Sequence, residues 1–306
     1  MKPVRVVLVS AVTALIISCA VVSFKLPSAK TNGHTTSAVG DTSAYDHVMT
    51  SKTIRCGYVV WPPYLDKDVN TGKISGLYHD YMEEFGRAFG LNVKWTEEIS
   101  ISDIASALDT GRIDAFCLPL GTAPARTLTM NFPRPIIYYP FYAYVRADDK
   151  RFDNDLGLIN DPGVTLSTME GEYTSILART TYPKAKILEI TNIQGSSTLF
   201  LNVQNKKADV IFQDPGAFSS YNKQNPGVLR QAGGMVGAVA GAFPLKLGDA
   251  KIQRLFDYGI ADLQDRFITE RLLRQYKFLG DADEDALLYM PTSGYRAPAI
   301  QPVSAE

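Results

Sequence analysis

Apolar residues along this chain follow two alternating spacings. Compact apolar runs, such as the one at 114–120, are typical of strands buried on both faces of a parallel sheet. Between such runs, apolar residues recur at helical spacing, as they do at 78–89, which predicts amphipathic helices. The order strand, helix, strand, helix, strand over 53–120 therefore predicts a parallel sheet with right-handed crossovers.

A second unit further along the chain repeats this order of elements. Its predicted strands lie at 163–167, 186–190 and 209–212, and its predicted helices at 174–180 and 197–203. The amphipathic helical region at 251–276 carries no third copy, and no regular element is assigned to the Gly-rich stretch 233–241. We predict a two-lobed α/β fold, each lobe a mainly parallel sheet flanked by helices, joined by a hinge that the chain crosses twice. The boundaries we assign are 51–144 with 241–290 for the first lobe and 145–240 for the second.

Two motifs with the same layout introduce the buried strands at 114–120 and 209–212. In each motif an Asp begins the apolar run, two residues after a basic side chain: Asp114 follows Arg112, and Asp209 follows Lys207. We expect both Asp residues to be structural, because short polar side chains cap or pair backbone groups at the turn from helix to strand.

Each of these strands is followed by a polar segment that carries a charge. The first leads into a loop that begins at Gly121 and contains Arg126, and the second ends at Asp214. Ligands of open α/β sheets bind at the carboxyl ends of the strands. If the two sheets face each other, Arg126 and Asp214 lie on opposite walls of one cleft, and such a pair suits a zwitterion.

The N-terminus has the pattern of an export signal, a positive start followed by an apolar run. Residues 1–25 are predicted to be a signal peptide or a membrane anchor, which places the rest of the chain in the periplasm or on the extracytoplasmic face. Cys19 lies in a sequence similar to a lipobox and is a candidate for lipidation. Residues 26–50 are predicted to be a flexible tether, and 291–306 are assigned to a C-terminal tail.

Composition narrows the function classes further. The 306 residues are 45% hydrophobic with a formal net charge of −1, which is typical of a globular protein and argues against nucleic acid as a partner. Three Cys and three His give no metal-ligand cluster, so we predict no metal and no cofactor. Cys56 and Cys117 fall in buried strands predicted to be neighbours. Two free thiols are favoured there, because bridges across adjacent parallel strands are uncommon, and pairing stays open.

Five spaced motifs share their order with a known family. They are a strand ending in Pro-Pro-aromatic at 57–64, a Gly-aromatic-x-x-Asp helix entry at 76–80, a Gly-Arg-x-Asp strand with a Pro-x-Arg loop at 111–126, an aromatic-rich stretch at 131–139, and an Asp-strand-Asp segment at 209–214. In this order and spacing the chain resembles the family 3 bacterial extracellular solute-binding proteins, the periplasmic receptors of polar amino-acid ABC importers, over about residues 53–276.

The resemblance implies roles for the residues that carry it. Arg126, on the loop that begins at Gly121, matches the residue that grips the ligand α-carboxylate, and Asp214 matches the residue that pairs the α-ammonium. Trp61 lies where an aromatic residue stacks on the ligand, with Tyr64 close by in sequence. Packing in the core of the lobe explains both aromatic residues as well as ligand contact does.

The second lobe departs from the family pattern at its expected anion site. Gly171 is implied to open a helix whose free N–H groups meet the ligand carboxylate. Glu172 and Tyr173 stand where a Ser/Thr pair is usual, and Pro119 in the first lobe replaces a frequent hydroxyl residue. A carboxylate at 172 repels the ligand carboxylate unless it points away or meets a cationic group. A structural role is the alternative for Glu172, in which its negative charge interacts favourably with the dipole of the helix that follows.

Three function classes are compatible with these features. The first is a non-catalytic receptor that captures an amino acid or related small polar zwitterion for an ABC permease, with membrane contact only through the N-terminal segment. The second is an enzyme of the cyclohexadienyl dehydratase type, for which Glu172 is the candidate acid. The third is a ligand-sensing receptor for a membrane signalling protein.

Overall fold

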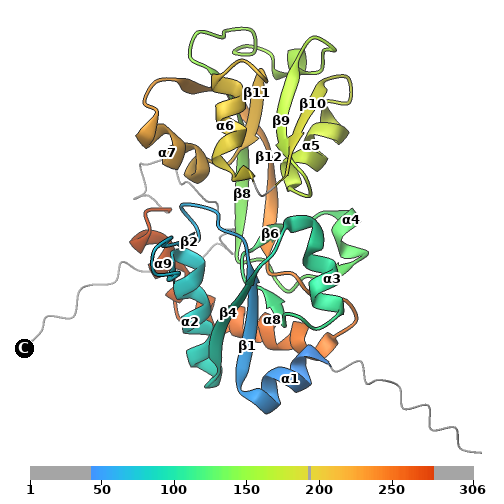
Figure 1. Ribbon diagram of the computed structural model, residues 1–306, viewed down its shortest axis with the longest axis vertical. Helices are drawn as coiled ribbons and strands as arrows, with labels where there is room; N and C mark the ends of the chain where they lie inside the picture. The colour runs from blue at the N-terminus through green and yellow to red at the C-terminus, as the bar shows by residue number, and fades with distance from the viewer. Residues whose placement is uncertain (1–42, 192–193, 279–306) are drawn as a thin grey trace, which may run out of the picture. The chain divides into compact units, whose positions relative to one another are not determined.

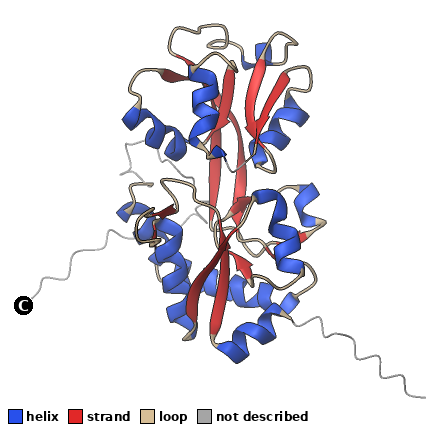
Figure 2. Cartoon of the chain, in the orientation of Figure 1, coloured by secondary structure: helices blue, strands red, loops and turns tan. Residues whose placement is uncertain are grey.

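The structure is a computed structural model and describes residues 43–191 and 194–278. Over these residues the chain builds two β-sheets, each flanked by helices, which is the predicted two-lobed α/β fold (Figure 2). The signal or anchor at 1–25, the lipidation candidate Cys19 and the tail at 291–306 lie outside the described residues. No helix within the described ranges is long and apolar enough to cross a membrane.

The first sheet contains five strands. In spatial order they are β4 (Asn92–Glu98), β1 (Thr53–Tyr58), β5 (Ala115–Phe116), β13 (Leu245–Lys246) and β7 (Met130–Asn131). The first three run parallel, whereas β13 is antiparallel to β5 and to β7. The helices on this side are α1 (Ala44–Ser51), α2 (Leu77–Phe89), α3 (Ile104–Asp109), α4 (Pro124–Thr127), α8 (Ala250–Asp265) and α9 (Ile268–Gln275). A 3-10 turn at Ile101–Asp103 precedes α3, and a small hairpin of β2 (Asp66–Lys67) and β3 (Ile74–Ser75) precedes α2.

The second sheet contains six strands. In spatial order they are β10 (Lys186–Ile190), β9 (Thr165–Met169), β11 (Val210–Gln213), β8 (Ile137–Arg146), β12 (Leu229–Ala242) and β6 (Leu120–Gly121). Its first three strands are again parallel and the others antiparallel, so each sheet is parallel only over the strand–helix repeat. The helices here are α5 (Tyr173–Thr181), α6 (Ser197–Gln204) and α7 (Pro215–Gln224), with a 3-10 turn at Leu156–Ile159.

Two long strands, β8 and β12, connect the sheets. They pair antiparallel over most of their length, and Figure 1 shows both running from the level of the first sheet into the second. The chain leaves the first sheet along β8 and returns along β12, which confirms the two-crossing hinge. The lobe boundary assigned between residues 144 and 145 falls inside β8, because residues 142–145 already pair with β11.

Two local expectations are wrong, and a third stretch, to which no element was assigned, forms a strand. Residues 44–50 are not part of a tether but form most of α1, whose N-terminus the Ser43 side chain caps and whose Val48 is fully buried. The single strand expected at 114–120 is divided into β5 and β6, which belong to different sheets. Pro119 lies between them and has no N–H to donate to a ladder. The Gly-rich stretch 233–241 is part of β12.

The repeated Asp residues have the structural role expected of them. Asp114 accepts the backbone N–H of Arg55 at 2.8 Å and the guanidinium of the same residue at 2.8 Å. Asp209 likewise accepts the backbone N–H of Thr165 at 3.0 Å and pairs with Arg151 at 2.6 Å. In each sheet the Asp before the inner strand thus fixes the start of the neighbouring parallel strand.

Cys56 and Cys117 form a disulfide, contrary to the expectation of two free thiols. Their strands are neighbours, as predicted, but Cys117 lies just beyond β5, where its N–H donates to the carbonyl of Gly57. The Cα–Cα distance of 5.4 Å at that point is within the range for a bridge. The disulfide therefore anchors the segment 118–121 to β1.

Replacing both cysteines by Ala is expected to lower the free energy of unfolding by about 2–4 kcal/mol. The reason is that the bond closes a loop over a sequence separation of 61 residues and so reduces the conformational entropy of the unfolded chain. Denaturant unfolding of the oxidised and reduced forms measures the change. A reductant should destabilise the wild type and leave the double variant unaffected. Equal behaviour of the two proteins with and without reductant would show that the bond contributes nothing.

Candidate functional site

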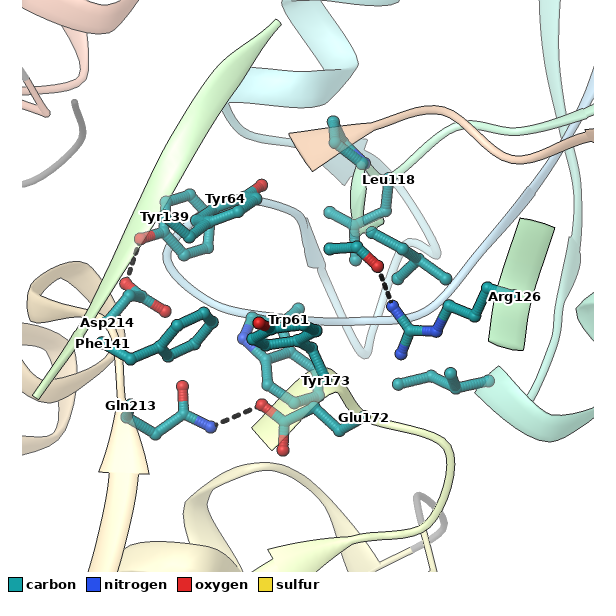
Figure 3. A pocket seen from close by; sticks show the side chains of 14 residues that line it. Trp61, Tyr64, Leu118, Arg126, Tyr139, Phe141, Glu172, Tyr173, Gln213 and Asp214 are labelled. Atoms are coloured by element: carbon teal, nitrogen blue, oxygen red, sulfur yellow. Dashed lines mark hydrogen bonds between the residues drawn. The ribbon is translucent and has the colours of Figure 1, made fainter. Parts of the chain in front are cut away.

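A cavity of about 70 Å³ lies where the two sheets meet. Residues from both sides line it, and seven of the eight residues proposed from the sequence are among them: Trp61, Tyr64, Gly121, Arg126, Glu172, Tyr173 and Asp214. The eighth, Gly171, lies beside the cavity and contacts Arg126 through its carbonyl. Figure 3 shows Arg126 at one side and Asp214 at the other, with Trp61 and Tyr173 between them.

Arg126 is a buried cation held by two backbone carbonyls. It belongs to α4, a short helix that begins at Pro124, and its side chain is 8% exposed. Its guanidinium donates to the carbonyl of Gly121 and, from the other side of the cavity, to the carbonyl of Gly171. Burial lowers the pKa of Arg126 to about 10, although the nearby Glu172 opposes that shift. The side chain is therefore cationic at neutral pH.

Gly171 has a backbone conformation that few other residues adopt. Its φ of 76° is in the left-handed region, and a Cβ there would lie 3.1 Å from the side chain of Ile101. Helix α5 does not begin at Gly171 as the family resemblance implied, since Glu172 is the N-cap and Tyr173 the first helical residue. The contribution of Gly171 to the site is thus its carbonyl group.

Asp214 is a buried carboxyl group with two donors on one oxygen. It is the N-cap of α7, and its Oδ1 accepts the N–H of Ala217 at 3.0 Å. The hydroxyl of Tyr64, which comes from the other side of the cavity, donates to the same oxygen. Gly216 leaves room for this contact, because a Cβ at that position would collide with the Tyr64 ring and hydroxyl. Burial raises the pKa of Asp214, and these hydrogen bonds oppose the shift.

Aromatic rings form much of the remaining wall. Tyr64 lies edge-on to Tyr139 and stacks on Phe278, with ring centroids 5.9 Å and 4.7 Å apart. Phe141 stacks on Tyr173 at 5.5 Å. The Tyr139 hydroxyl shares a hydrogen bond of 2.6 Å with Tyr78, so its polar end is satisfied within the wall. Besides Arg126 and Asp214, the cavity thus offers flat aromatic surface, and Glu172 with Gln213 adds a third polar position.

Glu172 is a buried acid with one oxygen bound and one oxygen free of partners. Its Oε1 accepts the side-chain N–H of Gln213 at 2.7 Å, whereas its Oε2 is buried without a hydrogen bond (Figure 3). Although Glu172 is the N-cap of α5, its side chain does not cap the helix. Burial is the largest cause of its shifted pKa, which is raised to about 7, and the carboxylate of Asp214 adds to that effect.

Several lining residues were not among those proposed from the sequence. They are Ile101, Leu118, Pro119, Leu120, Tyr139, Phe141 and Gln213. Tyr139 and Phe141 alternate along β8, a signal that one face of this strand lines the cavity, but the sequence alone did not show which face. Gln213 directly precedes Asp214 and had no chemical signal of its own.

The family model described as bacterial extracellular solute-binding proteins, family 3, matches residues 54–278. No curated protein matches the sequence.

Solved structures share the fold at low sequence identity. A cysteine-binding protein from Campylobacter jejuni is 17% identical, with a TM-score of 0.69 over 81% of this chain and 99% of that one. An ancestral amino acid-binding protein described as a precursor of cyclohexadienyl dehydratase is 21% identical, with a TM-score of 0.67 over 76% and 99%. An amino acid ABC transporter substrate-binding protein from Streptococcus pneumoniae, bound to L-arginine, is 18% identical, with a TM-score of 0.64 over 76% and 97%.

The burial of Glu172 predicts a stability effect that depends on pH. Its pKa rises from the ordinary 4.5 to about 7 on folding, so folding takes up a proton between these values and stability is lost as the pH rises through them. Glu172→Gln should therefore stabilise the protein relative to wild type at pH 8, by on the order of 2 kcal/mol, and much less at pH 5.

Thermal unfolding at both pH values measures this difference. Glu170→Gln is the matched control, because Glu170 is exposed two residues earlier and should give no such dependence. Equal shifts for Glu172→Gln at pH 5 and pH 8 would mean that Glu172 does not change protonation on folding.

Proposed function

Because the chain belongs to the family 3 bacterial extracellular solute-binding proteins, we propose that it captures an amino acid or a related small zwitterion and delivers it to an ABC importer. The observation that carries the proposal is the placement of two buried, opposite charges at the two sides of one cavity. Arg126 comes from the side of the first sheet and Asp214 from the second.

The two charges match the two ends of an α-amino acid. A guanidinium binds a carboxylate through two parallel hydrogen bonds, and a buried carboxylate is a partner for an ammonium group. The aromatic rings between them provide flat surface for the rest of the ligand. In support, solved relatives of the same fold include proteins described as binding cysteine or bound to L-arginine.

The two sheets are proposed to act as lobes that close on the ligand about β8 and β12. In this proposal the lobes are those assigned from the sequence, with their boundary moved within the hinge strands. The N-terminal residues 1–25 are proposed to direct export, so that the receptor works outside the cytoplasm.

A dehydratase of the cyclohexadienyl type is the second candidate, and the state of Glu172 favours it. A buried carboxylic acid with a pKa of about 7 is suited to protonate a leaving hydroxyl group. One structural relative is described as a precursor of such an enzyme. Incubation with a cyclohexadienyl carboxylate, followed by ultraviolet absorbance of the aromatic product, tests this candidate. Turnover that disappears in Glu172→Gln would favour the enzyme, and absence of turnover would favour the receptor.

Neutralising either end of the proposed clamp should abolish tight binding. After a thermal-shift screen of amino acids, opines and small carboxylates has identified a ligand, Arg126→Gln and Asp214→Asn should each weaken its binding by tens to thousands of times. Such factors correspond to the roughly 2–5 kcal/mol that is lost when a buried charge pair is broken. Isothermal titration calorimetry measures the affinities.

The choice of substitutions protects the fold. Asn is as good an N-cap as Asp, so Asp214→Asn keeps the start of α7 while it removes the charge. Arg134→Gln and Asp148→Asn are the matched controls, since both side chains are exposed. Wild-type affinity in Arg126→Gln would rule out the carboxylate-binding role of Arg126.

A further inference from the structure

Glu172 presents a problem that the proposed function leaves open. The proposed ligand carboxylate lies at Arg126, and Glu172 acts electrostatically on that same guanidinium. An ionised Glu172 would repel the carboxylate that Arg126 attracts. The structure therefore has to provide either a cationic partner for Glu172 or a neutral form of it.

We propose that Glu172 takes part in binding as a neutral carboxylic acid, donating its hydroxyl proton in a hydrogen bond to the ligand carboxylate, so that ligand binding is coupled to the uptake of a proton from solvent. The proposal rests on the proposed function, since it needs a ligand that carries a carboxylate. It identifies Glu172 as a further residue that determines specificity.

The position of Glu172 supports this role. The Arg126 guanidinium donates to the carbonyl of Gly171, so a ligand carboxylate at Arg126 lies next to the residue that follows Gly171. Glu172 is also the N-cap of α5, a place where the first N–H groups of the helix favour an anion. The Glu172 side chain makes no capping hydrogen bond to these groups, although the N–H of Ser175 already donates to the backbone carbonyl of Glu172.

The two oxygens of Glu172 are in different surroundings. Oε1 accepts the amide N–H of Gln213 at 2.7 Å, and an oxygen that accepts in this way serves as the carbonyl oxygen of a neutral acid. Oε2 is buried without a hydrogen bond. A buried polar atom without a partner is costly, and a rotation of the carboxyl group that turns a hydroxyl at Oε2 toward a bound carboxylate would give it one.

The charged groups that act on Glu172 have opposing effects. Arg126 on α4 favours the ionised form, as do the polar side chains of Thr174 on α5 and Gln213 on β11. Asp214, at the start of α7, favours the neutral form, and burial does so most strongly. The resulting pKa of Glu172 is about 7. The negative charge of a bound ligand carboxylate raises this pKa further, so Glu172 stays protonated at physiological pH.

The sign of the pH dependence separates the two roles open to Glu172. If it donates to a carboxylate, affinity falls by about tenfold per pH unit above its pKa, since the proton must be taken up on binding. If instead it pairs with a cationic group of the ligand as an anion, affinity rises with pH over the same range.

The experiment measures affinity by isothermal titration calorimetry between pH 6.0 and pH 8.5. The probes are L-arginine, L-lysine, L-cysteine and L-glutamine, and the α-carboxamide of whichever binds most tightly. The proteins are wild type, Glu172→Gln, and Glu170→Gln as the exposed control. Titrations at pH 8.0 in buffers of different ionisation enthalpy count the protons taken up.

We expect wild-type affinity for the tightest-binding amino acid to fall about tenfold from pH 7.5 to pH 8.5, with nearly one proton taken up at pH 8.0. Glu172→Gln keeps a hydrogen-bond donor but cannot titrate, so its affinity should change less than about twofold over this range and no proton should be taken up. Glu170→Gln should behave as wild type. The carboxamide should bind weakly, without the pH dependence.

Results that contradict the proton-donor role differ from results that contradict the proposed function. Affinity that is constant or rises with pH, or a Glu172→Gln variant that loses binding equally at every pH, would overturn the proton-donor role. Failure of all four amino acids to bind the wild type at any pH would instead count against the proposed function, and the inference would fail with it.

Discussion

The pocket depends on how a single buried cation is satisfied. The guanidinium of Arg126 is almost completely removed from water, which is unfavourable unless its donors find acceptors. Two backbone carbonyls provide them: that of Gly121, nearby in the chain, and that of Gly171, which lies across the cavity from α4. The same cation thus helps to hold the two sides together and offers the charge to which an anionic ligand group would bind. These two contacts use two of the five N–H donors of the guanidinium, so donors remain for an anionic group in the cavity.

A second contact across the cavity joins Tyr64 to the carboxyl group of Asp214. Tyr64 donates its hydroxyl to Asp214, and Asp214 at the same time caps α7. Gly216 makes the approach of Tyr64 possible, because any side chain at this position would block the contact between Tyr64 and Asp214. Both residues therefore have structural contacts and also line the cavity. Their replacement by Ala would remove a helix cap or leave carbonyls unpaired, which is why neutral side chains of similar shape are the better probes.

Much of the fold and of the site could be predicted from sequence because the signals are local. The apolar runs, the helical spacing and their repetition indicated two similar sheets, and Arg126 and Asp214 were placed together because each follows a buried strand. What was missed depends on long-range pairing. The small residues of β12 become a strand only because β8 lies beside them, and Gln213 matters only because Glu172 faces it. The Cys56–Cys117 bond likewise follows from where β5 ends, which sequence spacing does not define.

That disulfide has a consequence for the maturation of the protein. Disulfides form and persist in oxidising compartments, whereas the cytoplasm keeps thiols reduced. Cys117 directly precedes Leu118 and Pro119, so the bond fixes the base of a wall of the cavity. A newly made chain in a reducing environment therefore lacks one of the constraints that shape its own cavity. Formation of the bond in an oxidising compartment adds that covalent constraint to a segment that lines the cavity.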